Sequence, residues 1–309
     1  MSILVAGSTG QVGSRIVQEL GCSGAEVVAL THKKPAKGLP ANARAIRGDL
    51  LDVDFLQETL AGVDTVFLMN PVVPDELFRA LIALDACRRA NVRGLVYLSM
   101  VNSDRFVDVP HAAAKFAAER AIHDRDMAAT VLRPNYFMQN DLAQREAMTG
   151  KGIYASPIGA LGLPMVDLRD IAAIAAAELL RRDESETSLP AETIEVSGPD
   201  VMTGEEVAEV WSEVLDRSIA YGGDDLDSLE RTYRTMGTSA AARDVALMFK
   251  GFLTDGMVAD PDAAQKLAAR LGRPLRDYRS FATEAAANWG KPKPLLERVA
   301  DALLPGDHQ

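Results

Sequence analysis

The sequence predicts an α/β fold, with a doubly wound parallel sheet followed by a smaller, mostly helical C-terminal lobe. Three observations indicate this fold. Short β-branched apolar runs alternate with longer amphipathic stretches through the first half of the chain, which is typical of βαβ units. A turn with three glycines follows the first apolar run. From Thr203 onward, nearly every segment has apolar residues at helical spacing.

The strands of the first half are short runs rich in valine, isoleucine and leucine. We expect them near residues 2–6, 26–31, 43–47, 64–69, 94–99 and 129–132. The helices repeat apolar residues every three or four positions. We expect them near residues 11–22, 53–61, 75–91 and 112–127. Helices that connect most of the neighbouring strands predict a parallel sheet that is covered on both faces.

The second half of the chain begins with a predicted return to the sheet. An alanine-rich helix is expected over residues 167–182, and residues 193–196 have the pattern of one more strand, so the segment 166–200 is expected to rejoin the sheet. We therefore divide the chain into a sheet domain of residues 1–157 and a mostly helical lobe of residues 158–309.

Capping residues mark the helices of the lobe. Thr203 is the expected N-cap of a helix over residues 204–215, and Asp260 with Pro261 is the expected cap and first position of another. The tail from Pro305 onward is expected to be disordered.

Composition excludes several classes of protein. The chain of 309 residues is 48% hydrophobic and carries a formal net charge of −11, which disfavours binding to nucleic acid. No run approaches the ~20 apolar residues of a membrane span, and the N-terminus lacks the pattern of a signal peptide. We expect a cytoplasmic protein that binds no membrane and no nucleic acid, as a monomer or homodimer.

Cysteine and histidine usage predicts no metal site. Cys22 and Cys87 are too few for a disulfide framework, and both are expected to be reduced and buried. The four histidines, His32, His111, His123 and His308, lack ligand spacing. The sequence Gly-x-Ser-x-Gly of a nucleophile elbow is also absent, so this type of hydrolase chemistry is not expected.

A glycine-rich turn links the first strand to the first helix. Gly7, Gly10 and Gly13 follow the apolar run, with a first interval one residue longer than in the usual dinucleotide fingerprint. Glycines let the backbone approach a pyrophosphate, whose charge is stabilised at the helix start. On a Rossmann domain we expect phosphate contacts from Gly7, Ser8, Thr9, Gly10, Gln11, Val12 and Gly13. The alternative is a turn without a ligand.

The end of the second strand indicates which dinucleotide binds. An NAD-binding domain usually has an acidic residue there, which binds the ribose 2′-hydroxyl. Here the residues are Thr31, His32, Lys33 and Lys34. Because basic side chains can neutralise a 2′-phosphate, we expect NADP(H), with NAD(H) as the second choice. The alternative is that the lysines only make a surface loop soluble.

Six further motifs occur in an order and spacing that resemble a known family. They are Gly48–Leu50, Phe67–Pro71, Val96–Ser99, Leu132–Asn140, Val166–Ala172 and Ile194–Pro199. Together with the glycine turn, they resemble the NmrA-like branch of the atypical short-chain dehydrogenases/reductases over residues 1–290.

The resemblance implies where the rest of the cofactor lies. It places Asp49 near the adenine, Asn70 and Pro71 beside the adenosine ribose, and residues 135–137 near the nicotinamide. The contacts expected in these motifs are Asp49, Leu50, Met69, Asn70, Pro71, Ser99, Pro134, Asn135, Tyr136 and Phe137. Alternatives are that Asp49 caps a turn, that Asn70 and Pro71 end a strand, and that the aromatic residues belong to the core.

The Tyr-x-x-x-Lys pair of ordinary short-chain reductases is absent. The comparable helix instead carries His111 and Lys115, and the NmrA-like branch often keeps the lysine without the tyrosine. Residues four apart share a helix face, so Lys115 is expected to hold the nicotinamide ribose and His111 to deliver a proton. Lys115, His111 and Tyr136 are the candidate catalytic residues. The alternative is a solvated helix start.

The missing tyrosine restricts the acceptors that the protein is expected to reduce. A ketone or aldehyde needs a positioned acid, whereas a quinone accepts hydride to give a weakly basic anion and needs mainly a pocket that stacks it on the nicotinamide. We expect Tyr136, Phe137, Met138 and Met165 to form that pocket. The leading hypothesis is an NADPH-dependent reductase of quinones or similar conjugated or aromatic small molecules.

Two other functions fit the same motifs. One is a redox sensor that binds NADP(H) with little or no catalysis and acts through a protein partner. The other is a biosynthetic reductase, with Lys115 as general base and residues 204–290 shaping the pocket for a bulky natural product. A sensor should bind NADP(H) but oxidise no NADPH with any acceptor.

Overall fold

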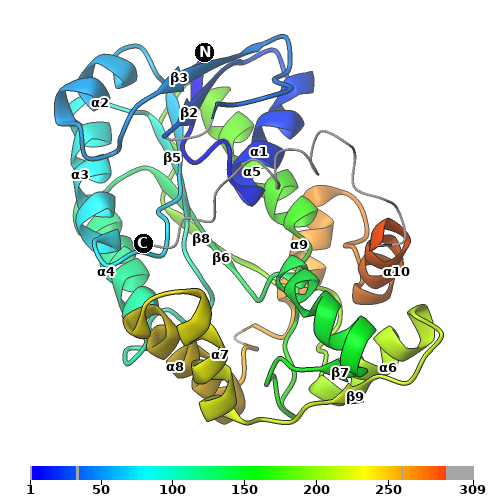
Figure 1. Ribbon diagram of the computed structural model, residues 1–309. Coiled ribbons are helices and arrows are strands. Elements are labelled where there is room, and N and C mark those ends of the chain that lie inside the picture. The colour runs from blue at the N-terminus through cyan, green and yellow to red at the C-terminus, as the bar shows by residue number, and fades with distance from the viewer. Residues whose placement is uncertain (1, 33–34, 259, 290–309) are drawn as a thin grey trace.

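The computed structural model describes residues 2–32, 35–258 and 260–289, and within them seven parallel strands form one sheet (Figure 1). The strand order is β3-β2-β1-β4-β5-β6-β8, so the chain winds outward in both directions from β1. The strands are β1 (Ser2–Val5), β2 (Glu26–Thr31), β3 (Ala43–Arg47), β4 (Thr65–Leu68), β5 (Gly94–Leu98), β6 (Ala129–Pro134) and β8 (Glu192–Val196). The predicted doubly wound α/β fold is confirmed.

Helices cover both faces of the sheet (Figure 1). Side chains of successive strand residues point to opposite faces, so Ile3 and Val5 pack in one hydrophobic core and Leu4 in the other. Helices α1 (Gln11–Glu19) and α5 (Leu168–Asp183) bury their apolar residues in the first core. The second core is covered by α2 (Val53–Leu60), α3 (Glu76–Arg89) and α4 (Pro110–Asp124). A short 3-10 helix, η1 (Leu20–Cys22), continues α1.

The chain returns to the sheet after α5. Strand β8 pairs in parallel with β6, and α9 (Ala263–Leu271) buries Leu267 in the core that α1 and α5 share. The division of the chain between residues 157 and 158 stays a prediction.

A third core holds the smaller lobe together. Its largest fully buried side chains are Trp211, Tyr154, Tyr278 and Phe252. The elements around this core, three of which precede residue 158, are η2 (Met138–Gln144), η3 (Ala147–Lys151), β7 (Ile153–Tyr154), α6 (Gly204–Val214), β9 (Ala220–Tyr221), α7 (Leu226–Met236), α8 (Ser239–Asp255) and α10 (Tyr278–Trp289). Among the described residues, no helix has the length and apolar character that a membrane crossing requires.

Two local expectations are wrong. Thr203 is the N-cap of α6, as predicted, but α9 begins at Ala263 with Asp262 as its N-cap. Asp260 instead bends the chain before the helix, because its carboxylate accepts the N–H of Asp262 at 2.9 Å. Cys87 is buried as expected, whereas Cys22 is exposed at the end of η1. The tail from Pro305 lies outside the described residues.

A buried carboxylate ties the lobe to the end of the sheet. Asp141 in η2 is fully buried and accepts hydrogen bonds from three tyrosine hydroxyls: Tyr136 after β6 at 3.2 Å, Tyr154 in β7 at 3.1 Å and Tyr278 in α10 at 2.5 Å. The indole N–H of Trp211 donates to the Tyr278 hydroxyl at 2.8 Å. Burial raises the pKa of Asp141 to about 6, although the three hydroxyl donors oppose this shift.

We predict that Asp141 makes the protein less stable as the pH rises. The folded protein keeps this proton up to about pH 6, whereas an ordinary aspartate loses it near 3.8. The contribution of this proton to the free energy of unfolding is therefore complete below about pH 4 and is lost by about pH 6, a change on the order of 3 kcal/mol. The check is urea unfolding of wild type and Asp141→Asn across this range. The stability difference between the two proteins should shrink up to about pH 6 and then stay level. A difference independent of pH would contradict the prediction.

Candidate functional site

The glycine turn brings the start of α1 close to the end of β1. Gly7 has a φ of +66°, which favours glycine, and a Cβ on Gly13 would lie 2.3 Å from the Gly7 carbonyl oxygen. Gly10 is the N-cap of α1, and neither a side-chain cap nor an acidic residue in the first turn occupies the helix start. The N–H groups at this end can therefore bind an anion.

Other residues of the turn have structural partners. The Ser8 hydroxyl donates to the Leu30 carbonyl at 2.8 Å and fixes the turn against β2. The Val12 side chain is buried in the core. Its backbone N–H, in the first turn of α1, is therefore the part that a ligand could contact. Thr9 and Gln11 are exposed.

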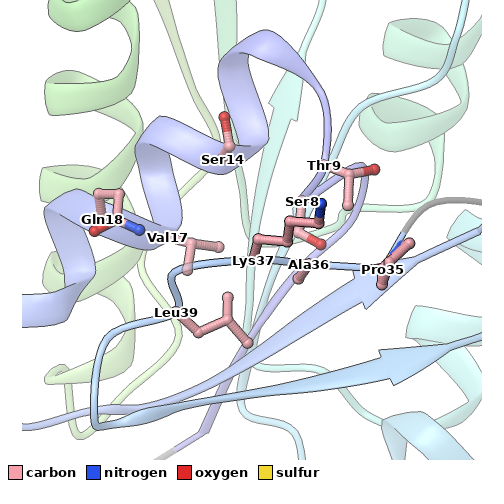
Figure 2. A pocket seen from close by; sticks show the side chains of 9 residues that line it. All are labelled: Ser8, Thr9, Ser14, Val17, Gln18, Pro35, Ala36, Lys37 and Leu39. Atoms are coloured by element: carbon pink, nitrogen blue, oxygen red, sulfur yellow. The ribbon is translucent and has the colours of Figure 1, made fainter. Parts of the chain in front are cut away.

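A cavity of about 430 Å³ lies between the turn, α1 and the segment after β2 (Figure 2). It is lined by Ser8, Thr9, Ser14, Val17, Gln18, Pro35, Ala36, Lys37 and Leu39. Lys37 brings a positive charge to this cavity, and the sequence analysis did not single it out. Lys33 and Lys34 lie outside the described residues, so their expected contacts stay predictions.

Three of the residues expected around the adenosine, Thr31, His32 and Asp49, already have partners within the protein. The Thr31 hydroxyl donates to the Ile46 carbonyl at 3.3 Å, and exposed His32 lies 3.7 Å from the Asp49 carboxylate. Asp49 also accepts the N–H of Leu51 at 3.0 Å and pairs with Arg79 at 3.1 Å. The Leu51 hydrogen bond holds the pKa of Asp49 below its usual value. Asp49 thus caps a turn, and its contact with adenine stays a prediction.

A second cavity, of about 280 Å³, opens at the carboxyl ends of β4, β5 and β6. Its apolar lining is Met69, Val72, Leu98, Met100, Pro134, Tyr136, Phe137, Met248, Phe252 and Met257. Its polar lining is Asn70, Ser99, His111, Lys115, Asn135 and Asn140. We call this space the acceptor cavity. Met138 and Met165, which were expected in its wall, are buried in the lobe core instead, and Pro71 is exposed.

Asn70 has no hydrogen-bond partner for either side-chain polar atom among the described residues, although it is 3% exposed. An amide buried in this way costs free energy unless a ligand satisfies it. The neighbouring Met69 methyl lies against the glycine turn, 3.1 Å from where a Cβ on Gly7 would be. Asn70 is therefore a buried amide, between the turn and the acceptor cavity, whose hydrogen-bonding capacity no described residue satisfies.

Three other polar residues of the cavity are occupied by protein partners. The Asn135 amide donates to the Met257 carbonyl at 2.8 Å, which holds a segment of the lobe against the end of β6. The Ser99 hydroxyl donates to buried Glu119. The Tyr136 hydroxyl donates to Asp141, and burial raises its pKa well above the usual value. Tyr136 therefore presents its ring to the cavity, and its catalytic role stays a prediction.

Lys115 and His111 share the cavity wall at the start of α4, and each has a carboxylate partner. Lys115 Nζ lies 2.9 Å from Glu76 Oε1 on α3. His111 Nδ1 lies 2.6 Å from Asp244 Oδ2 on α8, and the His111 backbone N–H donates to Asp244 Oδ1 at 3.0 Å. The side chains of Lys115 and His111 are 9% and 11% exposed, so a solvated helix start is excluded. Burial raises the pKa of Glu76, although Lys115 opposes the shift.

Neither carboxylate was among the residues predicted from the sequence. Glu76 follows β4 in the first turn of α3, so the rule that sites lie beyond strand ends offered a signal for it. Asp244 lies 133 residues from His111, on a helix of the lobe, and no local pattern connects the two.

Comparison with known proteins identifies the family. The sequence profile of the NmrA-like family matches residues 1–237. The chain belongs to the NmrA-like family. The predicted family resemblance is confirmed.

This NmrA-like protein is 30% identical over 294 residues to the NAD(P)H azoreductase of Xenophilus azovorans, and the match covers 93% of this chain and 99% of the relative. The NADPH complex of the Escherichia coli NADPH-dependent quinone oxidoreductase is 20% identical, with a TM-score of 0.80 and coverage of 94% and 100% of the two chains. The NADP(H) complex of the Citrobacter sp. triphenylmethane reductase is also 20% identical, with a TM-score of 0.78 and coverage of 92% and 100%.

We predict strong coupling between Glu76 and Lys115 in this NmrA-like protein. Glu76→Gln leaves the Lys115 ammonium buried without its counter-charge and should lower the free energy of unfolding by about 3 kcal/mol. Lys115→Met should cost less, because Glu76 already has a raised pKa and can take up a proton. Since the double variant removes both charges, its loss should fall short of the sum by about 1 kcal/mol or more. Urea unfolding of the four proteins measures the coupling, and additive losses would show that the pair does not interact.

Proposed function

We propose that this protein is an NADPH-dependent reductase that transfers hydride to a flat conjugated acceptor such as a quinone or an azo compound. The acceptor cavity carries the proposal. It combines an unsatisfied buried amide, Asn70, with thioether and aromatic side chains at the carboxyl ends of parallel strands, where ligands bind in doubly wound sheets. The names of the azoreductase relative and of the quinone oxidoreductase neighbour support this class of reaction.

The residues present fit a bound dinucleotide. Gly13 lets the start of α1 pack directly against the backbone of the turn, where a Cβ would meet the Gly7 carbonyl oxygen at 2.3 Å, and in this proposal the N–H groups at the helix start bind the pyrophosphate. Asn70 would satisfy its amide on the cofactor, and Lys115, held by Glu76, would hydrogen bond to the ribose. When bound, the reduced nicotinamide supplies the hydride. Lys37 and His32 would then neutralise the 2′-phosphate beside the first cavity.

The apolar wall of the acceptor cavity is the reason for proposing a flat conjugated acceptor. Tyr136, Phe252 and Phe249 pack edge to face, with centroids between 5.1 and 6.2 Å apart, so the rings beside the cavity are fixed. Met69, Met248 and Met257 add polarizable side chains that adapt to flat aromatic surfaces. In this proposal the wall stacks a conjugated acceptor against the nicotinamide and excludes water.

We predict that purified protein oxidises NADPH when menadione or methyl red is supplied as the acceptor. NADPH absorbance measures turnover. Gly13→Ala should weaken NADPH binding by about tenfold or more, because the added methyl group would collide with the Gly7 carbonyl group and push the turn away from the helix start that binds the anion. Gly24→Ala is the control, since a Cβ there meets no atom within 4 Å. Tight NADPH binding without turnover of any acceptor would contradict the proposal and favour the redox sensor.

We further predict that Lys37 contributes to the choice of NADPH over NADH. Lys37→Ala should weaken NADPH binding by about tenfold, the worth of one charge-assisted hydrogen bond, and change NADH binding little. Lys151→Ala removes an exposed lysine of η3 and serves as the matched charge control. Fluorescence titration with each nucleotide checks the prediction. Equal losses of affinity for the two nucleotides would show that Lys37 does not interact with the 2′-phosphate.

A further inference from the structure

We infer that Asp244 is the positioning residue that holds His111 as the proton donor to acceptors whose reduced form must be protonated. This inference rests on the proposed function. It adds a residue of the helical lobe to the reaction and divides the acceptors into a class that needs the proton and a class that does not.

One face of α8 supplies both the cavity wall and the carboxylate. Asp244, Met248 and Phe252 follow each other at intervals of four, so they lie along the same side of the helix. Met248 and Phe252 line the acceptor cavity, and Asp244 reaches His111 at the start of α4. Figure 1 shows α7 and α8 beside this end of α4. The position of His111 therefore depends on how the lobe packs against the sheet domain.

The two hydrogen bonds to Asp244 determine which His111 nitrogen can serve the cavity. One carboxylate oxygen accepts the His111 backbone N–H at 3.0 Å, and the other lies 2.6 Å from Nδ1. A carboxylate can only accept, so Nδ1 carries a hydrogen and Nε2 is the nitrogen left for an acceptor. The proposed step requires a second hydrogen on Nε2, and this hydrogen is the one that the acceptor takes.

The other cavity groups that carry an acidic or hydroxyl hydrogen already have protein partners. Lys115 pairs with Glu76, the Ser99 hydroxyl donates to Glu119, and the Tyr136 hydroxyl donates to Asp141. The remaining polar lining consists of asparagine amides, which are not acids at neutral pH. Among the described residues, the charged groups near His111 include Asp244 from α8, Glu76 from α3 and Lys115 from its own helix. His111 is the described cavity residue best placed to release a proton.

Acceptors differ in whether they need that proton. In an azo bond, hydride forms an N–H bond at one nitrogen, and the π pair moves to the other nitrogen, which takes the proton from His111 Nε2 to give the hydrazo product. His111 then regains a proton from water, and NADP⁺ is the oxidised product. A cationic triphenylmethane dye takes hydride at its central carbon and becomes neutral without a proton. A quinone depends on the donated proton to an intermediate degree, because its phenolate-type product is weakly basic.

The test compares acceptors on one variant, Asp244→Asn. The amide oxygen can keep the bond to the His111 backbone, but the amide N–H₂ group turned to Nδ1 can no longer accept a hydrogen from it. We expect kcat for methyl red to fall about tenfold or more relative to kcat for crystal violet, with menadione between them. Asp255→Asn, which removes a charge at the exposed end of the same helix, should leave this ratio as in wild type.

A second readout needs neither cofactor nor turnover. Two-bond ¹H–¹⁵N NMR spectra of histidine-labelled protein report which ring nitrogen carries hydrogen, and His111→Gln assigns the signal. We expect a hydrogen on Nδ1 in wild type and its loss from Nδ1 in Asp244→Asn. A wild-type signal with Nδ1 unprotonated would overturn the inference.

The outcomes separate the inference from the proposed function. If wild type reduces none of the three acceptors, the proposed function fails. If wild type reduces them and Asp244→Asn slows all of them equally, or raises KM alone, Asp244 only fixes the packing of α8 and the inference is overturned.

Discussion

The close approach of α1 to the turn after β1 is the constraint on which the rest of the site depends. No side chain fits between them, because a Cβ on Gly13 would lie 2.3 Å from the Gly7 carbonyl oxygen. β1 lies between β2 and β4, so the crevice opens where the two halves of the sheet diverge. The cavity beside Lys37 lies on one side of this crevice and the acceptor cavity on the other.

Local patterns were enough to predict the sheet domain. Each strand and helix of this domain has its own apolar period, the glycine turn is a short local connection between β1 and α1, and the His111 to Lys115 spacing lies within α4. The cap of α9 was harder, because Asp260 and Asp262 compete for the role and proline favours the first helical position. Cys22 was placed inside by composition alone, whereas the chain turns outward at the end of η1.

The acceptor side of the site could be predicted only in part. The ends of β4, β5 and β6 are adjacent in any parallel sheet, so Asn70, Ser99 and Tyr136 could be expected near one another. The pattern of α8 shows that one of its faces is buried, but not which partner covers it. Asp244 and Met248 reach the cavity only through tertiary packing.

The three tyrosine hydroxyls that donate to Asp141 also fix the shape of the acceptor cavity. Tyr136 belongs to that cluster and to the acceptor cavity, and Asn135 beside it fastens Met257 to the end of β6. Moving the lobe away from the sheet would leave a buried carboxylate short of donors, at a considerable cost in free energy. The cavity is therefore pre-formed, and its aromatic rings lose little conformational freedom when a ligand binds. The shape of the cavity is thus set by the packing of the lobe against the sheet before any ligand binds.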